Sequence, residues 1–383
     1  MKKINTVIYG GTGSIGDSFF SVEKANRTKF NIEAITCNNN IKKLLKLSDE
    51  FNIKKIGFNK KKLKNFNKED FNNHKYFTSI DDFGKMISSK TDVIVFAISG
   101  LKAINLLVEI LKTGKKIGIA NKECIISLGD NINKMTLKYG TSLIPLDSEH
   151  NSIFHLLKDS KNKFSSITIT ASGGPFLDLN YKNFKNITPN QAIKHPIWKM
   201  GKKISVDSST MMNKALELIE AKYLFNLKSR QIKAIVHPQS IVHALINYEN
   251  GASTALLYRP NMEVPISTLF FNFNKFNNNF TELSLDKLSD LQFFEVNKIK
   301  FPAISIAYDI IDMGGLAPNV FNYLNEILVD KFLRGKISFI DIIKLNYENI
   351  DRVFKKNTNI LNPNYDDIVN INNWIDKNIY LGK

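Results

Sequence analysis

The stretch Thr6-Val-Ile-Tyr9-Gly10-Gly-Thr-Gly13-Ser-Ile-Gly16 decides the fold class that this sequence predicts. Its first four residues are typical of a short buried strand, and a helix-like segment begins at Asp17, after the glycine-rich turn. Strand, glycine-rich turn and helix are the context that a dinucleotide-binding fingerprint requires. Gly10 would make the tight turn, Gly13 would let the backbone approach a pyrophosphate, and Gly16 would permit close helix packing. The N–H groups at the helix N-terminus would then bind the phosphates.

The second predicted strand, residues 31–36, leads into a segment that bears on the choice of nucleotide. An NAD enzyme favours an acidic residue here for the ribose hydroxyls, whereas NADP needs cations or neutral donors for its 2′-phosphate. The segment contains Asn38, Asn39 and Asn40 and no acid, and Lys42 and Lys43 follow it. The sequence therefore favours NADP.

Two later apolar runs, residues 92–97 and 115–120, are typical of buried parallel strands, and the second ends in Asn121-Lys122-Glu123. Residues at the carboxyl ends of parallel strands face the ligand crevice. Lys122 is therefore expected where cofactor and substrate meet. A surface ion pair between Lys122 and Glu123 is the alternative.

The segment Leu146-Asp147-Ser148-Glu149-His150-Asn151 follows a strand-like run at 142–145 and places two carboxylates one residue apart. In an extended backbone, side chains at i and i+2 point to the same side. Two like charges held that close need a cation, and carboxylate oxygens favour a divalent ion such as Mg²⁺ or Mn²⁺. A solvated acidic pair at a strand end is the alternative.

A turn at Ser172-Gly-Gly-Pro175 follows another strand-like run at 165–170, and its free N–H groups could form an anion nest. The next segment carries His195, Trp198 and Met200 among Pro, Gly and several lysines. This composition suits a loop that closes over a ligand. A core role is the alternative for Trp198.

A helix is predicted next, with Asp207 or Ser208 near its N-cap. Asn213 and Glu217 are four residues apart and would share a face of this helix. Glu217 could complete a site of three carboxylates, while Ser208, Asn213 and Lys214 hold an anion nearby.

The remaining sequence has weaker signals. His237 follows a strand-like run at 232–236, and we interpret it as structural. Residues 272–279 are rich in Phe and Asn and indicate a linker. From Phe301 onward, apolar residues recur at helical spacing, which predicts a helical C-terminal domain.

Composition limits the class of protein. A chain of 383 residues predicts two or three domains, with ordinary hydrophobic (43%) and charged (23%) contents. Two cysteines, Cys37 and Cys124, suit a reducing compartment, and neither a signal peptide nor a membrane-spanning run is recognisable, so we expect a cytoplasmic protein without membrane contact. The net charge of +17 is spread along the chain, which disfavours nucleic acid as a partner but would attract an anionic substrate.

Taken together, the motifs resemble the 1-deoxy-D-xylulose 5-phosphate reductoisomerase family. The resemblance covers effectively the whole chain, with Asn325-Glu326 also matching. The motifs that carry it occur in family order: Gly10 to Gly16, Ala120-Asn-Lys-Glu123, Pro145 to Asn151, Ser172 to Phe176, His195-Pro-Ile-Trp198, Lys203 to Ser208, Thr210 to Lys214 with Glu217, and His237-Pro-Gln-Ser240 with His243.

The resemblance implies an α/β fold with a Rossmann-type parallel sheet, an α+β catalytic domain and a C-terminal helical domain. The expected boundaries are 1–147 for the NADPH domain, 148–271 for the catalytic and dimerisation domain, 272–297 for a linker and 298–383 for the helical domain. It also implies a homodimer that uses NADPH and Mg²⁺ or Mn²⁺. The implied reaction converts 1-deoxy-D-xylulose 5-phosphate, a phosphorylated sugar, to 2-C-methyl-D-erythritol 4-phosphate in the non-mevalonate route to isoprenoid precursors.

The resemblance also implies roles for individual residues. Metal ligands are Asp147, Glu149 and Glu217, and catalytic roles fall to Lys122, Glu149, His195 and His243. Substrate contacts are Lys122, Ser148, Glu149, Ser172, His195, Trp198, Ser208, Asn213, Lys214 and Glu217. Cofactor contacts are Gly10, Gly11, Thr12, Gly13, Ser14, Ile15, Asn38, Asn39, Asn40, Asn121, Lys122, Glu123 and Gly201.

Two other functions compete with this one. The first is a dehydrogenase acting on a phosphorylated hydroxy acid or aldehyde without rearranging the carbon skeleton. The three acids and the phosphate contacts disfavour it, because hydride transfer alone needs no chelated diol. The second is a basic nucleic-acid-binding protein. The chain also departs from the family at Asn39, where a lysine for the 2′-phosphate is expected.

Overall fold

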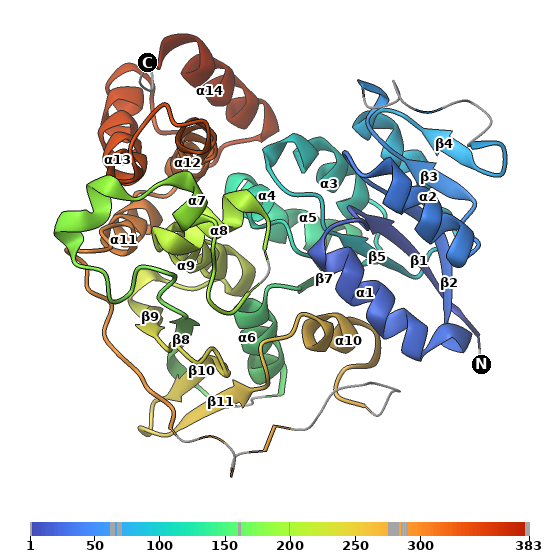
Figure 1. Cartoon of the computed structure of the whole chain (residues 1–383), viewed down its shortest axis with the longest axis horizontal. Helices are drawn as coiled ribbons and strands as arrows, with labels where there is room; N and C mark the ends of the chain where they lie inside the picture. Colours follow the sequence, from blue (N-terminus) through green and yellow to red (C-terminus); the bar gives the residue numbers. More distant parts are fainter. Residues whose placement is uncertain are drawn as a thin grey trace. The chain divides into compact units, whose positions relative to one another are not determined.

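The computed structural model describes the chain as two compact units (Figure 1). The first unit comprises Met1–Cys124, Lys134–Asn151 and Asn261–Glu282, and the second comprises Ile125–Asn133, Ser152–Pro260 and Leu283–Lys383. Within them the structure describes residues 2–61, 66, 71–159, 162–198, 200–274, 283, 284, 286, 288 and 290–379. The predicted linker at 272–297 therefore lies partly outside the described residues, and the four domain boundaries stay a prediction.

A seven-stranded parallel sheet forms the centre of the first unit. Its spatial order is β4-β3-β2-β1-β5-β6-β7, so the chain winds outward from β1 in both directions. This is the doubly wound arrangement of nucleotide-binding folds. The strands are β1 (Ile4–Tyr9), β2 (Phe30–Thr36), β3 (Lys55–Gly57), β4 (Lys75–Phe77), β5 (Val93–Phe96), β6 (Lys116–Ile119) and β7 (Ser142–Pro145).

Apolar side chains from strands and helices form the core of this unit. Phe19 of the first helix lies with its ring centroid 5.7 Å from both Phe30 and Phe270, so the first helix packs between β2 and the returning helix of residues 263–271. Burial raises the pKa of the Cys37 thiol to about 12, which keeps this cysteine protonated. The helices of the unit are α1 (Ser14–Ala25), α2 (Ile41–Glu50), α3 (Ile104–Leu111) and α10 (Glu263–Phe271).

Three helices contribute residues to both units, namely α4 (Lys122–Leu128), α5 (Asn131–Tyr139) and α6 (Ser148–Asp159). Short 3-10 helices complete the connections: η1 (Arg27–Lys29), η4 (Ile80–Met86), η5 (Leu101–Ala103), η6 (Tyr181–Asn186) and η7 (Ser229–Gln231).

A mixed four-stranded sheet of order β11-β10-β8-β9 lies in the second unit. β8 and β9 are parallel, and β10 is antiparallel to both β8 and β11. The strands are β8 (Phe164–Ala171), β9 (Ile232–Val236), β10 (Val242–Tyr248) and β11 (Ser253–Leu257). The helices that precede β9 are α7 (Pro189–Ala192), α8 (Lys202–Ser209) and α9 (Met212–Phe225).

The C-terminal part of the second unit is helical, as the apolar periodicity predicts. A row of buried amides at Asn319, Asn322 and Asn325 follows one face of the long helix of residues 317–333. One of them, Asn322, donates to the Ser127 hydroxyl, so this helix is tied to α4 by a buried polar contact. The helices are α11 (Ala303–Met313), α12 (Ala317–Leu333), α13 (Phe339–Lys356) and α14 (Tyr365–Asn378).

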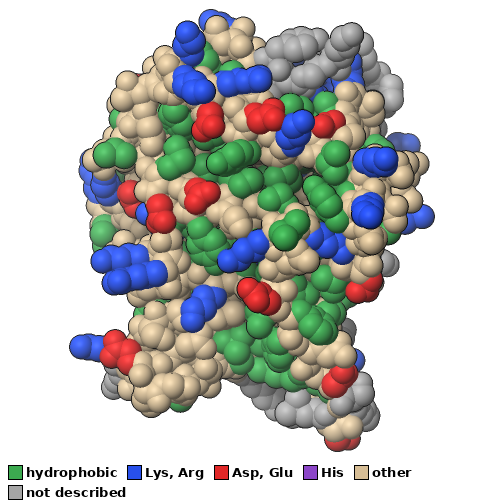
Figure 2. All heavy atoms as spheres, turned by 90° about the vertical axis from the view of Figure 1, so that its left-hand side faces the viewer, with side chains coloured by type: hydrophobic (Ala, Val, Ile, Leu, Met, Phe, Trp, Pro, Cys, Tyr) green, Lys and Arg blue, Asp and Glu red, His purple; other side chains and the backbone are tan. Residues whose placement is uncertain are grey.

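None of the described helices is both long enough and apolar enough to span a bilayer. On the face drawn in Figure 2, Lys and Arg side chains are scattered among acidic and hydrophobic ones. The positive charge on that face is therefore dispersed and does not form one patch.

Candidate active site

The glycine-rich turn between β1 and α1 has the geometry that a dinucleotide site needs. Gly10 has a φ of +83°, which a residue with a side chain rarely adopts. A Cβ atom on Gly16 would lie 2.0 Å from the carbonyl oxygen of Gly11, so only glycine allows α1 to start this close to the turn. Gly13 and Ser14 are exposed at the beginning of α1. The N-terminal N–H groups of α1 are thus accessible to a phosphate.

The segment after β2 places its three asparagines at the start of α2. Asn40 is the N-cap residue, and its side chain accepts a hydrogen bond from the Lys43 N–H at 3.1 Å. The Asn38 side chain accepts one from Asn59 at 3.4 Å, whereas Asn39 is exposed. These side chains are neutral and exposed, and the absence of an acid from residues 38–40 is consistent with NADP.

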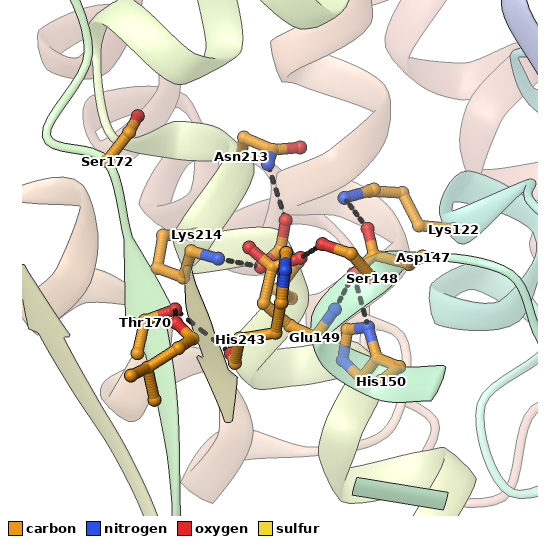
Figure 3. Close-up of polar contacts among 12 residues, drawn as sticks. Lys122, Asp147, Ser148, Glu149, His150, Thr170, Ser172, Asn213, Lys214 and His243 are labelled. Atoms are coloured by element: carbon orange, nitrogen blue, oxygen red, sulfur yellow. Dashed lines mark hydrogen bonds and ion pairs between the residues drawn. The ribbon is translucent and has the colours of Figure 1, made fainter. Parts of the chain in front are cut away.

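The end of β6 carries a buried cation. The Asn121 side chain donates to the carbonyl oxygens of Ile98 and Gly100 and accepts from the Cys124 N–H, which fixes the start of α4. Lys122 is buried, and its ammonium lies 3.1 Å from the Asp147 carboxylate (Figure 3). The alternative of a surface ion pair at this position is therefore wrong.

The two acids after β7 are close, but not in the extended backbone that the sequence predicts. α6 begins at Ser148, and Asp147 accepts a hydrogen bond from the Glu149 N–H at 3.3 Å, as an N-cap residue does. The segment begins a helix and does not continue the extended strand, because Asp is favoured at the N-cap of a helix and Glu in its first turn. Asp147 also contacts the His150 ring at 3.2 Å, and Ser148 donates to Glu149 (Figure 3).

In the second unit, the serine-and-glycine turn lies against the end of α8. Gly174 has a φ of +68°, and a Cβ atom there would be 2.8 Å from the Ser208 carbonyl oxygen. The Ser172 hydroxyl accepts from the Gly174 N–H at 3.2 Å. The turn with Ser172 and the last residues of α8 with Ser208 are therefore neighbours, as a shared anion site requires.

His195 connects the predicted closing loop to this turn. Its Nδ1 accepts hydrogen bonds from the N–H groups of Ile197 and Trp198, at 3.1 and 2.9 Å, so Nε2 carries the proton. Nε2 lies 3.0 Å from the Ser172 hydroxyl and donates to it. Burial lowers the pKa of His195 to about 4, which keeps the ring neutral near pH 7.

The helix predicted around Asp207 and Ser208 is interrupted in the structure. Both residues lie in α8, and α9 begins only at Met212. The Thr210 hydroxyl donates to the carbonyl oxygen of Val206 and accepts from the Met212 N–H, so it competes with the helical hydrogen bonds. Met211 takes a φ of +59° at the break. The predicted N-cap at Asp207 or Ser208 was therefore wrong.

The first turns of α9 hold a buried acid of the candidate site. The side chain of Glu217 is 1% exposed and accepts hydrogen bonds from Asn213 and Lys214, four and three residues earlier on the helix. The shared face of Asn213 and Glu217 is confirmed. The carboxylate lies beside a buried ammonium, and such a pair needs precise geometry to offset its loss of hydration.

His243 lies on β10, stacked on Tyr258 and edge-on to Trp198. Its ring centroid is 3.7 Å from that of Tyr258 and 6.4 Å from that of Trp198. Tyr258 has no signal in the sequence, because it reaches His243 only through the pairing of β10 with β11, which Tyr258 directly follows. His237, by contrast, contacts the Gln292 carbonyl oxygen at 2.8 Å and stacks on Phe293, the structural role that its position predicts.

The surroundings of Asp207 were not predicted from the sequence. Its carboxylate is 1% exposed and lies between the Lys203 ammonium at 2.7 Å and the Asn325 amide at 2.9 Å. The residue is adjacent to Ser208, so α12 supports the end of α8 through this contact. The presence of Asn325-Glu326 among the family motifs was the one signal that pointed here.

Each unit therefore assembles its own share of the predicted residues. The first unit brings together the glycine turn and, separately, a carboxylate pair beside a lysine. The second unit brings together a serine turn, a neutral histidine and a carboxylate clamped by a lysine. Met200 is half-buried and Gly201 is exposed before α8, and the cofactor contact predicted for Gly201 stays a prediction.

Models of one protein family match most of this chain. The model described as 1-deoxy-D-xylulose 5-phosphate reductoisomerase matches residues 6–129. The C-terminal domain models of the same family match residues 143–225 and 257–378.

Full-length relatives and solved structures agree with these matches. The 1-deoxy-D-xylulose 5-phosphate reductoisomerase of Pelagibacter ubique is 39% identical over 99% of both chains, and that of Thermoanaerobacter sp. is 35% identical over 99% of this chain and 98% of its own. A crystal structure of DOX-P reductoisomerase with NADPH, fosmidomycin and magnesium is 30% identical, with a TM-score of 0.89 over 98% of this chain and 97% of its own. The enzyme from Zymomonas mobilis in complex with NADPH is 32% identical, with a TM-score of 0.87 over 97% of both chains.

Proposed function

The chain belongs to the 1-deoxy-D-xylulose 5-phosphate reductoisomerase family, and we propose that the residues described above carry out that reaction. The reaction converts 1-deoxy-D-xylulose 5-phosphate to 2-C-methyl-D-erythritol 4-phosphate with NADPH as reductant. When bound, the dication supplies Lewis acidity and NADPH supplies hydride. The residues of the chain bind and orient these groups and the substrate.

We propose that Asp147, Glu149 and Glu217 hold the dication. Each offers a carboxylate oxygen, the donor type that Mg²⁺ and Mn²⁺ prefer. A relative was crystallised with magnesium, which supports the choice of metal.

We propose that Ser172, Ser208, Asn213 and Lys214 bind the phosphate of the substrate. Two features of the second unit support this: the contact between the serine turn and the end of α8, and the buried ammonium of Lys214 near the start of α9. Binding energy from this remote phosphate can position the reacting carbons.

We propose that Lys122 and Ser148 contact the substrate oxygens near the metal, and that His195, Trp198, Met200 and His243 enclose the substrate. Neutral His195, with its proton on Nε2, is a donor toward Ser172 and carries no charge that would compete with the metal. Lys122 can stabilise negative charge that develops on a substrate oxygen.

For NADPH we propose the turn of residues 10–15 for the diphosphate, residues 38–40 for the adenosine ribose, and residues 121–123 with Gly201 for the nicotinamide end. The positive φ of Gly10 and the contact of Gly16 with Gly11 support the first assignment. The remaining cofactor contacts rest on the family resemblance.

The observation that carries this proposal is the Glu217 carboxylate, buried between Asn213 and Lys214. The test is NADPH oxidation with 1-deoxy-D-xylulose 5-phosphate, with and without added Mn²⁺, followed by NMR of the product. We expect metal-dependent oxidation and a branched carbon skeleton. An unbranched product would instead support the dehydrogenase alternative.

Three further expectations belong to the proposal. We propose a homodimer, supported by the position of β11 at an edge of its sheet, and sedimentation velocity tests it. The four-part domain division and a cytoplasmic location are proposed from the sequence.

A steep fall of DNA or RNA retention with salt would support the nucleic-acid alternative instead.

A further inference from the structure

A cation reaches the glycine turn from α2. The Lys43 ammonium lies 3.0 Å from the carbonyl oxygen of Thr12 and 2.5 Å from the carboxylate of Asp17. All three residues belong to the first unit. Lys43 therefore joins the two segments, one after β1 and one after β2, that flank the ribose in a dinucleotide fold.

The backbone places Lys43 at a defined position on α2. The Asn40 cap places Lys43 in the first turn of α2, where its N–H is held by the Asn40 oxygen. Its side chain is 30% exposed, whereas that of Asp17 is 60% exposed. An ion pair with so exposed a partner is weak, so the ammonium can exchange Asp17 for a phosphate.

We propose that Lys43 recognises the 2′-phosphate of NADPH in this chain, in place of the lysine that the family has at position 39. The inference rests on the nucleotide site proposed above. Asn39 is neutral and offers no charge to a phosphate dianion, whereas Lys43 brings a full positive charge to the same edge of the sheet. Lys43 is thus a specificity-determining residue for NADPH over NADH.

The test is calorimetric binding of two nucleotides that differ at the 2′-position, 2′,5′-ADP and 5′-AMP. For Lys43→Gln we expect the affinity for 2′,5′-ADP to fall roughly tenfold or more, because a charge-assisted hydrogen bond is lost. The affinity for 5′-AMP stays unchanged. Lys46→Gln, which removes the same charge from an exposed position on α2, is the matched control and should change neither affinity.

A second variant separates recognition from folding. Adding Asn39→Lys to Lys43→Gln should restore binding of 2′,5′-ADP, because the lysine is supplied at the family position. The inference is overturned if Lys43→Gln weakens both nucleotides equally, which would indicate a purely structural contact with Thr12. It is also overturned if Lys42→Gln causes the selective loss. A wild-type chain that binds both nucleotides equally would reject the NADPH site itself.

Discussion

The two units each contain a lysine–carboxylate pair, but the pairs are built differently. Lys214 and Glu217 are three residues apart on α9, and their side chains are 5% and 1% exposed. Lys122 and Asp147 follow the neighbouring strands β6 and β7, and Asp147 is 17% exposed. Helix geometry alone forms the first pair, whereas the second depends on the register of a sheet. The lysine–carboxylate pair of the second unit is thus formed within one helix, whereas the pair of the first unit depends on tertiary structure.

The largest expected effect comes from removing the charge of the buried acid. Glu217→Gln should lower metal-dependent turnover roughly a thousandfold or more, because one of the proposed metal ligands is lost while the side chain keeps its shape. NADPH binding, measured by cofactor fluorescence, should stay nearly intact. The exposed carboxylate of Asp330 on α12 offers a control, since Asp330→Asn should leave turnover unchanged. Full activity of Glu217→Gln would contradict the metal assignment.

The second-largest expected effect is on the free energy of unfolding, which should differ between the two lysine–carboxylate pairs. Lys214→Met takes the ammonium away from a fully buried carboxylate, and we expect it to cost about 3–5 kcal/mol of unfolding free energy. Lys122→Met should cost only about 2 kcal/mol, because Asp147 is partly hydrated and also contacts His150. Urea titration of the metal-free protein measures both. Equal losses would show that burial does not distinguish the pairs.

The smallest expected effect is on how the free energy of unfolding depends on pH, through His195 of the second unit. His195 has its pKa lowered to about 4 from 6.5 by burial, so the folded state favours the neutral ring. Its contribution to stability is complete above pH 6.5 and is lost as the pH falls through 4. His195→Gln should therefore make unfolding free energy less sensitive to acid between pH 6.5 and 4. An unchanged pH profile would show that the pKa of the ring is the same in the folded and unfolded states.

Much of the first unit could be predicted because parallel strands buried on both faces are continuous apolar runs. β1, β5, β6 and β7 lie where these runs predict them. β3 and β4 were missed, since three residues are too few to show a period. The candidate residues at strand ends followed from topology, but the backbone at Asp147 did not, because a helix cap and a strand end share the same residues.

The second unit was harder to predict. The pattern from Val206 to Glu217 satisfies a helical period, and only the hydroxyl of Thr210 interrupts it. The stacking of Tyr258 on His243 depends on cross-strand pairing, and the support of Asp207 by Asn325 joins residues 118 positions apart. Such contacts leave no periodic signal in a single sequence.

The interruption at Met211 limits how far this protein can be stabilised by design. A non-glycine residue at a φ of +59° costs about 1 kcal/mol or more, so alanines at 210 and 211 would favour one straight helix from α8 into α9. That helix would turn Ser208 and Asn213 to different sides. A more heat-resistant variant obtained in this way would lose the arrangement of Ser208 and Asn213 that we propose for binding the substrate phosphate, so higher stability would come with lower activity.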